Sequence, residues 1–236
     1  MSELLFRQDA YLQHCSAVVT QVAEQGIQLD RTIFYPNGGG QPGDSGLLRL
    51  ADGREIAIVN SVKGGAADEV WHVPAEGSIL PAVGEAVQLE LDWARRYTHM
   101  RYHTALHLLC AVVDAPVTGG QVAHDKARLD FGVEMAALDK DAIEAQLNAL
   151  VDAAQPVTAR WISDAELDAQ PELVKTMSVS PPRGAGEVRL IEVAGTDLQP
   201  CGGTHVRNTV EIGRLVVQKI KSEGKQNKRI IIAFAA

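Results

Sequence analysis

The sequence has few of the features that indicate disulfide bonds, a membrane span or a signal peptide. Its three cysteines, Cys15, Cys110 and Cys201, are too few and too scattered for a disulfide framework. No apolar run reaches the roughly 20 residues that a membrane span needs. The N-terminus, MSELLFRQDAYLQH, has polar and acidic residues where a signal peptide would have an apolar core. We therefore expect a cytoplasmic protein that does not associate with a membrane.

Several catalytic motifs are absent as well. The glycine-rich stretch 38–46 is not followed by the Gly-Lys-Ser/Thr of a phosphate-binding loop, and we find no motif for ATP use and no obvious Ser-His-Asp set. The net charge of −8 argues against charge-driven binding of nucleic acid over the whole surface, although a local basic patch remains compatible with it. At 236 residues and 46% hydrophobic, the chain suits one large or two small domains.

The first ninety residues favour β-structure. Short apolar runs alternate with turn signals such as Asp52-Gly53, and Val87, Leu89 and Leu91 recur at every second position. This spacing predicts a small barrel or sandwich in a first domain, residues 1–92. The expected strands are 11–22, 25–29, 32–35, 47–50, 55–62, 70–73 and 86–91.

From residue 93 onward the pattern becomes mixed, which predicts a second domain, 93–236, and an α+β fold class. Residues 94–114 have the three- and four-residue apolar spacing of a helix that faces a core, and Pro116 ends it. We expect a second helix from a cap at Asp139 to residue 151, and a short helix opened by the capping box Ser163-Asp-Ala-Glu166. The remaining expectations are loops at 118–127 and 180–186, strands at 128–133, 157–162 and 188–193, and a terminal hairpin of 212–221 with 228–234.

Two pairs of metal-ligating residues stand about a hundred positions apart. His103 and His107, in HTALH, are spaced i, i+4, which places both imidazoles on one face of the predicted helix. Cys201 and His205, in CGGTH, have the same spacing, bridged by two glycines that permit a tight turn. Three imidazoles and a thiolate would fill a tetrahedral zinc site. His99 lies one further turn before His103, and we expect it to flank the site.

These motifs carry a family resemblance. HTALHLL at 103–109, GTDLQPCGGTHV at 195–206 and EIG at 211–213 resemble the alanyl-tRNA editing family, which includes freestanding proteins and the editing domain of alanyl-tRNA synthetase. FYPNGGGQPGDSG at 34–46 and KIKSEGKQNKRI at 219–230 match as well, in the family's order. Threonyl-tRNA synthetase editing domains share the ligand pairs, but the glycine-rich block indicates the alanine branch. The resemblance implies a small N-terminal β-barrel domain followed by a two-layer α/β editing domain of the threonyl/alanyl-tRNA synthetase type.

The resemblance also implies an activity. We expect an aminoacyl-tRNA deacylase that hydrolyses the ester of mischarged tRNA(Ala) carrying serine or glycine, with Zn²⁺ bound by His103, His107, Cys201 and His205. Zinc could be structural, could be catalytic, or could position the terminal ribose. A zinc-stabilised tRNA-binding module without hydrolysis is the alternative. From the length of 236 residues we do not expect a full synthetase, because the family's aminoacylation domain is missing, and the oligomeric state is left open.

The remaining site residues come partly from the resemblance, as for Thr104 and the glycine-rich loop, and partly from local chemistry, as for the turn glycines and the basic tail. Thr104 is expected to contact the substrate, unless its hydroxyl bonds its own helix backbone, and the amides of Gly202 and Gly203 are expected to stabilise an oxyanion. The glycine-rich loop, otherwise an exposed turn, is expected to border the substrate pocket through Gly38, Gly39, Gly40, Gln41 and Asp44. The basic tail, otherwise a solvated hairpin, is expected to contact tRNA phosphates through Lys219, Lys221, Lys225 and Lys228.

Overall fold

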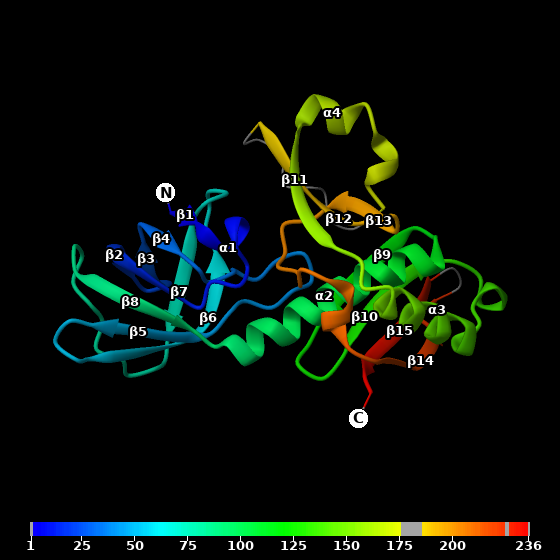
Figure 1. Ribbon diagram of the computed structural model, residues 1–236. Coiled ribbons are helices and arrows are strands. Elements are labelled where there is room, and N and C mark those ends of the chain that lie inside the picture. Colours follow the sequence, from blue (N-terminus) through cyan, green and yellow to red (C-terminus); the bar gives the residue numbers. More distant parts are fainter. Residues whose placement is uncertain (1, 176–185, 225–226, 236) are drawn as a thin grey trace. The chain divides into compact units, whose positions relative to one another are not determined.

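The computed structural model describes residues 2–175, 186–224 and 227–235, which fold into two compact units (Figure 1). The first unit comprises Met1–Gly38 with Pro42–Thr98, and the second comprises Gly39–Gln41 with His99–Ala236. The division therefore falls inside the helix predicted for 94–114, and three residues of the glycine-rich loop group with the second unit. Among the described residues, no helix is long and apolar enough to cross a membrane.

The first unit is built on a closed six-stranded barrel, which decides between the barrel and the sandwich left open by the sequence. Along β8 the side chains of Val87, Leu89 and Leu91 are buried in the barrel core, whereas those of Ala86 and Gln88 are exposed. The period of two thus places one face of each strand inside. In order around the barrel the strands are β2 (His14–Ala23), β3 (Gly26–Leu29), β7 (Val70–Pro74), β6 (Glu55–Lys63), β5 (Gly46–Leu50) and β8 (Ala86–Leu91).

A short N-terminal segment packs beside the barrel strands within the same unit. β1 (Glu3–Leu4) pairs in parallel with β4 (Arg31–Thr32), and the short helix α1 (Leu5–Gln8) follows β1. The strand expected at 32–35 ends at Thr32, because the next backbone groups find side-chain partners instead of a neighbouring strand. The Tyr35 amide, for example, donates to Asp44 Oδ2 at 2.6 Å.

The main sheet of the second unit has four strands in the order β14-β15-β10-β9. Its strands are β14 (Leu215–Ser222), β15 (Asn227–Phe234), β10 (Ala127–Gly132) and β9 (Val117–Val122). The first three were expected, but the loop expected at 118–127 is wrong, because β9 occupies its first half. Its two glycines lower strand propensity, yet Gly120 pairs opposite Leu129 and Val122 opposite Ala127, so β10 provides the hydrogen bonds that stabilise β9.

Two helices of the expected length belong to this part of the chain. α2 (Trp93–Val113) matches the predicted helix, and it is buried along most of its second half. α3 (Lys140–Asp152) begins after the predicted cap, with the Asp139 carboxylate accepting from the amides of Asp141 and Ala142. α3 packs against β14, where the buried Asn148 side chain bonds both the amide and the carbonyl of Leu215 at 2.9 Å.

A second, three-stranded antiparallel sheet carries the turn that holds the later ligand pair. It consists of β11 (Val157–Ser163), β12 (Glu187–Val193) and β13 (Asp197–Pro200). The predicted capping box is confirmed: Ser163 and Glu166 bond each other's backbone at the start of α4 (Asp164–Asp168). Most of the loop expected at 180–186 lies outside the described residues. The short 3₁₀ turns are Met135–Ala137, Pro171–Leu173 and Thr209–Ile212.

Candidate metal centre

The first ligand pair lies on α2, as its spacing predicts. His103 and His107 are both buried, one helical turn apart, with their ring centroids 5.6 Å from each other. The helix has no glycine or proline between them, so the backbone is regular and the relative position of the two rings follows from the helical geometry alone.

The second pair lies in the turn that follows β13. Arg189 on β12 donates from Nη1 to the carbonyls of Cys201 and Gly203, at 2.9 and 2.8 Å, and so holds both ends of the Cys-Gly-Gly segment. Gly203 is required by a close approach: a Cβ there would lie 2.2 Å from Cε1 and 2.4 Å from Nδ1 of His103. A Cβ at Gly202 would meet no atom within 4 Å.

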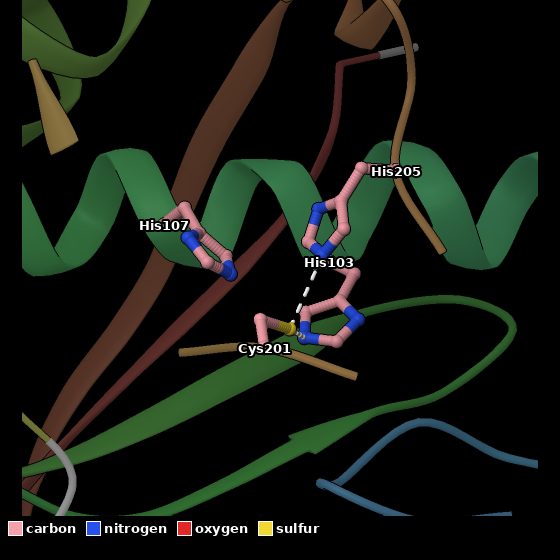
Figure 2. A group of neighbouring side chains, drawn as sticks. All are labelled: His103, His107, Cys201 and His205. Carbon is pink, nitrogen blue, oxygen red and sulfur yellow. Dashed lines mark hydrogen bonds between the residues drawn. The ribbon is translucent and has the colours of Figure 1, made fainter. Parts of the chain in front are cut away.

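The four predicted ligands converge on one point. Figure 2 shows the three imidazoles and the thiol turned toward one another, and one ligand atom from each residue lies within 4.8 Å of all the others. Cys201 Sγ is 3.5 Å from His103 Nε2 and 3.3 Å from His205 Nε2. Nitrogen and sulfur ligands of a tetrahedral metal ion stand about 3.5 Å apart. The cluster therefore fits a metal ion in size and donor type, and His99 is not a member of it.

Each imidazole is anchored through its other nitrogen. Nδ1 of His103 lies 2.8 Å from Gln41 Oε1, that of His107 lies 2.8 Å from Asp197 Oδ2, and that of His205 lies 3.1 Å from Thr104 Oγ1. The Gln41 and Asp197 oxygens can only accept, and the Thr104 hydroxyl donates its single hydrogen to the Met100 carbonyl. All three Nδ1 atoms therefore carry a hydrogen, so that in the neutral form of each ring the Nε2 lone pair faces the metal position.

The anchor of His107, Asp197, is in turn bonded to a partly exposed lysine. The Asp197 side chain is fully buried, and its Oδ1 lies 2.9 Å from Nζ of Lys175, whose side chain is 29% exposed. Gln199 donates to Oδ2 of the same carboxylate at 2.8 Å. No role for Asp197, Lys175 or Gln199 is predicted from the sequence. The available signal was the acidic residue four positions before Cys201 in DLQPC, because metal-binding histidines usually bond a carboxylate or carbonyl.

The electrostatics of the cluster favour a thiolate. Burial alone would raise the pKa of Cys201, but the interactions of its sulfur with the surrounding imidazoles outweigh this effect and lower the pKa well below its usual value. Burial lowers the pKa of His205 to about 3, so this imidazole stays neutral. A thiolate beside a neutral imidazole is the protonation state that a metal requires.

His107 differs from His205 because its neighbours include a carboxylate. Burial disfavours its charged form, but the hydrogen bond that His107 donates to Asp197 and the interaction with Cys201 raise the pKa of His107 to about 9. Burial also opposes ionisation of Asp197, and His107 and Lys175 together lower the pKa of this carboxyl to about 2. Without a metal, His107 is thus an imidazolium ion between two anions.

Thr104 faces the protein and not an open pocket. Its side chain is completely buried, and besides donating to Met100 its hydroxyl accepts from His205 Nδ1 and from the Val206 amide at 3.3 Å. One hydroxyl has one hydrogen and two lone pairs, so these three bonds fill its capacity. The backbone bond that the sequence left as the alternative is present, together with a role in supporting His205.

The two glycine amides expected to stabilise an oxyanion differ from each other. The Gly203 amide donates to Cys201 Sγ at 3.4 Å, and Gly203 is buried. Gly202 is half-buried, and no hydrogen bond of its amide is found within the described part of the chain. Of these two amides, that of Gly202 therefore has no acceptor among the described residues.

The glycine-rich loop divides between the two units. Gly39, Gly40 and Gln41 belong to the second unit, where Gln41 contacts His103 and Thr204. Gly38 and Asp44 belong to the first unit. Asp44 is buried there in an ion pair with Arg96, and its expected contact with substrate stays a prediction.

The basic tail is more neutralised than its sequence indicates. Lys219 is exposed on β14, but Lys221 Nζ lies 2.6 Å from Glu223 Oε1. Lys228 is buried and donates to the Gly224 carbonyl at 3.1 Å. Lys225 lies outside the described residues. Of the three described lysines in this set, Lys219 is exposed, Lys221 is half-buried and Lys228 is buried.

Family models match most of the chain. Residues 188–231 match the "Threonyl and Alanyl tRNA synthetase second additional domain", and residues 8–95 match "tRNA synthetases class II (A)". The first of these ranges contains Cys201 and His205, whereas His103 and His107 lie between the two ranges.

Relatives that match nearly the whole of this chain agree with these family models. The alanyl-tRNA editing protein AlaX-M of Methanosarcina acetivorans is 36% identical over 98% of both chains. AlaX-L of Pyrococcus horikoshii is 31% identical over 98% of this chain and 57% of its own length. The alanine–tRNA ligase of Metallosphaera sedula is 33% identical over 93% of this chain but only 25% of the ligase.

Proposed function

The chain belongs to the alanyl-tRNA editing protein family, and on that premise we propose that it is a hydrolase that removes wrongly attached amino acids from tRNA(Ala). The observation that carries the proposal is the convergence of His103, His107, Cys201 and His205 within 4.8 Å in a chain that matches editing proteins along its whole length. The second unit is accordingly the editing domain of the threonyl/alanyl-tRNA synthetase type. Its place of action is the cytoplasm.

We propose zinc as the metal of this centre. Three imidazoles and one thiolate form a donor set of mixed softness that is typical of Zn²⁺, and the distances between donors suit a tetrahedral ion. When bound, zinc supplies a positive charge that can polarise an ester carbonyl or orient the terminal ribose of the tRNA. Cys201 then serves as a ligand, which excludes it as a nucleophile.

The Gly202 amide is the best candidate for stabilising the developing oxyanion. It is half-buried, it lies beside the Cys201 ligand, and open space surrounds the position of its missing Cβ. A backbone N–H that is already fixed in the turn stabilises negative charge with little reorganisation. The Gly203 amide is less suited to this role because it donates to sulfur.

The substrate class follows from the family and from chemistry. We propose Ser-tRNA(Ala) as the main substrate, with Gly-tRNA(Ala) also cleaved and Ala-tRNA(Ala) spared. A site that hydrogen-bonds the serine hydroxyl would favour serine over alanine, because alanine leaves the site's polar group unpaired. This argument does not extend to glycine, which we include on the family resemblance alone. The phosphates of the tRNA would meet exposed cations such as Lys219.

One observation favours the alternative, a zinc-stabilised tRNA-binding module without hydrolysis. Four protein ligands already fill a tetrahedral site, whereas catalytic zinc usually keeps one position for water or substrate. In this case zinc would join α2 to the Cys201 turn and would take no part in chemistry.

Deacylation assays separate the two functions. Purified Ser-, Gly- and Ala-tRNA(Ala) are incubated with the full-length chain, without ATP, before and after removal of metal by a chelator. The proposal expects hydrolysis of the serine and glycine esters, protection of the alanine ester, and loss of activity with loss of metal. Binding of tRNA without hydrolysis of any ester at micromolar enzyme would support the binding module.

A further inference from the structure

Gln41 is a buried amide at the metal centre that comes from a distant part of the sequence. Its side chain is 2% exposed. Oε1 accepts from His103 Nδ1 at 2.8 Å and from the Thr204 amide at 3.1 Å, while Nε2 donates to Thr204 Oγ1 at 2.8 Å. One carboxamide therefore joins a ligand of the first pair to the turn that carries the second pair.

The glycines before Gln41 allow it to reach this position. Gly39 and Gly40 have φ values of +56° and +80°, which side-chain-bearing residues rarely adopt. The Gly40 carbonyl accepts from the Val122 amide at 2.8 Å, and a Cβ on Gly40 would lie 2.8 Å from the Gly120 carbonyl oxygen. Gly40 thus lies against the edge strand β9, and the next residue points its side chain at His103.

We propose that Gln41 is a positioning residue of the metal centre, which keeps His103 and the Cys201–His205 turn in the geometry that binds the metal. It does so by fixing the hydrogen of His103 on Nδ1, which leaves Nε2 free for the metal. This inference rests on the proposed function in one respect, that a metal occupies the four ligands. It assigns the centre of the glycine-rich loop to metal binding instead of substrate selection.

The role depends on an acceptor at Oε1, and this makes it separable from substrate contact. A glutamate at this position could accept from His103 Nδ1 and the Thr204 amide, and the Thr204 hydroxyl can rotate to donate to it. A leucine of similar size could accept nothing. A residue that contacts substrate would show no such equivalence between glutamine and glutamate, because the charge would alter the pocket.

The test uses the full chain with Gln41→Leu, Gln41→Ala and Gln41→Glu. Gln88→Leu is the matched control, since Gln88 is exposed and bonds Ser16 in the barrel unit. Zn²⁺ dissociation constants are measured by competition with a chelator, and the visible spectrum of the Co²⁺ form reports ligand geometry. We expect Gln41→Leu and Gln41→Ala to weaken zinc binding about 10- to 100-fold and to change the Co²⁺ bands, as loss of an outer-shell partner does. Gln41→Glu and Gln88→Leu should keep the wild-type affinity and spectrum.

Two outcomes would overturn the inference, and they have different meanings. If the wild type binds zinc and both Gln41→Leu and Gln41→Ala bind it equally well with an unchanged Co²⁺ spectrum, Gln41 does not position the metal centre, and the proposed function stands. If the wild type binds no metal, the metal centre itself is rejected together with the inference. Gln41→Leu and Gln41→Ala differ in side-chain volume. If one of them fails to fold, the zinc affinity of the other still tests the inference.

Discussion

Nδ1 of His107 lies 2.8 Å from Oδ2 of Asp197, and this carboxylate is completely shielded from solvent. This hydrogen bond fixes the orientation of the His107 ring, the second ligand candidate on α2. Nζ of Lys175 lies 2.9 Å from Oδ1 of Asp197 and balances the buried negative charge. A carboxylate–histidine–metal arrangement orients the ring and raises the basicity of its ligand nitrogen.

Replacement of this carboxylate should therefore weaken metal binding. Asp197→Ala removes the acceptor of His107 Nδ1 and leaves Lys175 without its partner, so we expect about a 10- to 100-fold rise in the Zn²⁺ dissociation constant. Chelator competition at neutral pH measures it. Asp152→Asn is the control, because Asp152 is exposed, lies far along the sequence from the ligands, and forms a surface ion pair with Arg214 at 3.9 Å. Equal affinities in both variants would contradict the role of Asp197.

Thr104→Val should act on the metal centre before it acts on specificity. The variant leaves His205 Nδ1 and the Val206 amide without an acceptor in a buried site, at a cost of about 1–3 kcal/mol. We expect lower zinc affinity, and equal fractional loss of activity on Ser- and Gly-tRNA(Ala), with recovery in Thr104→Ser. A changed serine-to-glycine ratio at unchanged zinc affinity would instead indicate contact between the Thr104 hydroxyl and the substrate.

Substitution by alanine should reduce metal content at one glycine of the ligand turn and not at the other. In Gly203→Ala the new methyl group would overlap His103, so the ring must move away from the ligand position. Gly202→Ala introduces a methyl group into open space. Elemental analysis should find wild-type metal content in Gly202→Ala and greatly reduced content in Gly203→Ala. Full occupancy in Gly203→Ala would show that the turn can shift to accommodate the methyl group.

Metal binding should release a proton from His107 at neutral pH. In the metal-free protein burial lowers the pKa of His107, but Asp197 and Cys201 raise it more, to about 9. The imidazole is therefore charged below pH 9 and must lose its Nε2 hydrogen to bind metal. Proton competition therefore weakens binding as pH falls from 9, and affinity should rise with pH up to about 9. Calorimetry in buffers of different ionisation enthalpy measures the release directly. Affinity that is independent of pH between 7 and 9 would contradict the raised pKa.

Lys219 and Lys228 should differ in their effect on tRNA binding. Lys219 is exposed, whereas Lys228 is buried and bonded to Gly224. Lys219→Ala should reduce the slope of log affinity against log salt by about 1 if the ammonium group contacts one phosphate. Lys228→Met, which keeps the buried volume, should leave the slope unchanged. The reverse pattern would mean that the hairpin rearranges when tRNA binds.

Sequence patterns correctly predicted the features that depend on interactions between residues a few positions apart. The i, i+4 spacing placed His103 and His107 on one face of α2, the Asp139 cap and the Ser163–Glu166 box started their helices, and alternation along β8 indicated a sheet with one buried face. The pairing of HTALH with CGGTH was also readable, because the two motifs together offer the four donors of a tetrahedral metal site. Each of these features depends on residues within a few positions of one another, or on donor chemistry that is plain from residue type.

Tertiary structure decided what surrounds the ligands. Gln41 and Thr204 are 163 positions apart, and nothing local to either indicates that one carboxamide will join them. β9 forms despite two glycines because β10 supplies its hydrogen bonds. The Thr104 hydroxyl is occupied because folding brings His205 and Val206 against α2, and Lys228 is buried by its place in the sheet. Burial and hydrogen-bond partners belong to the folded chain as a whole, so the sequence alone identified the four donors that cluster and only the structure identified the residues that hold them.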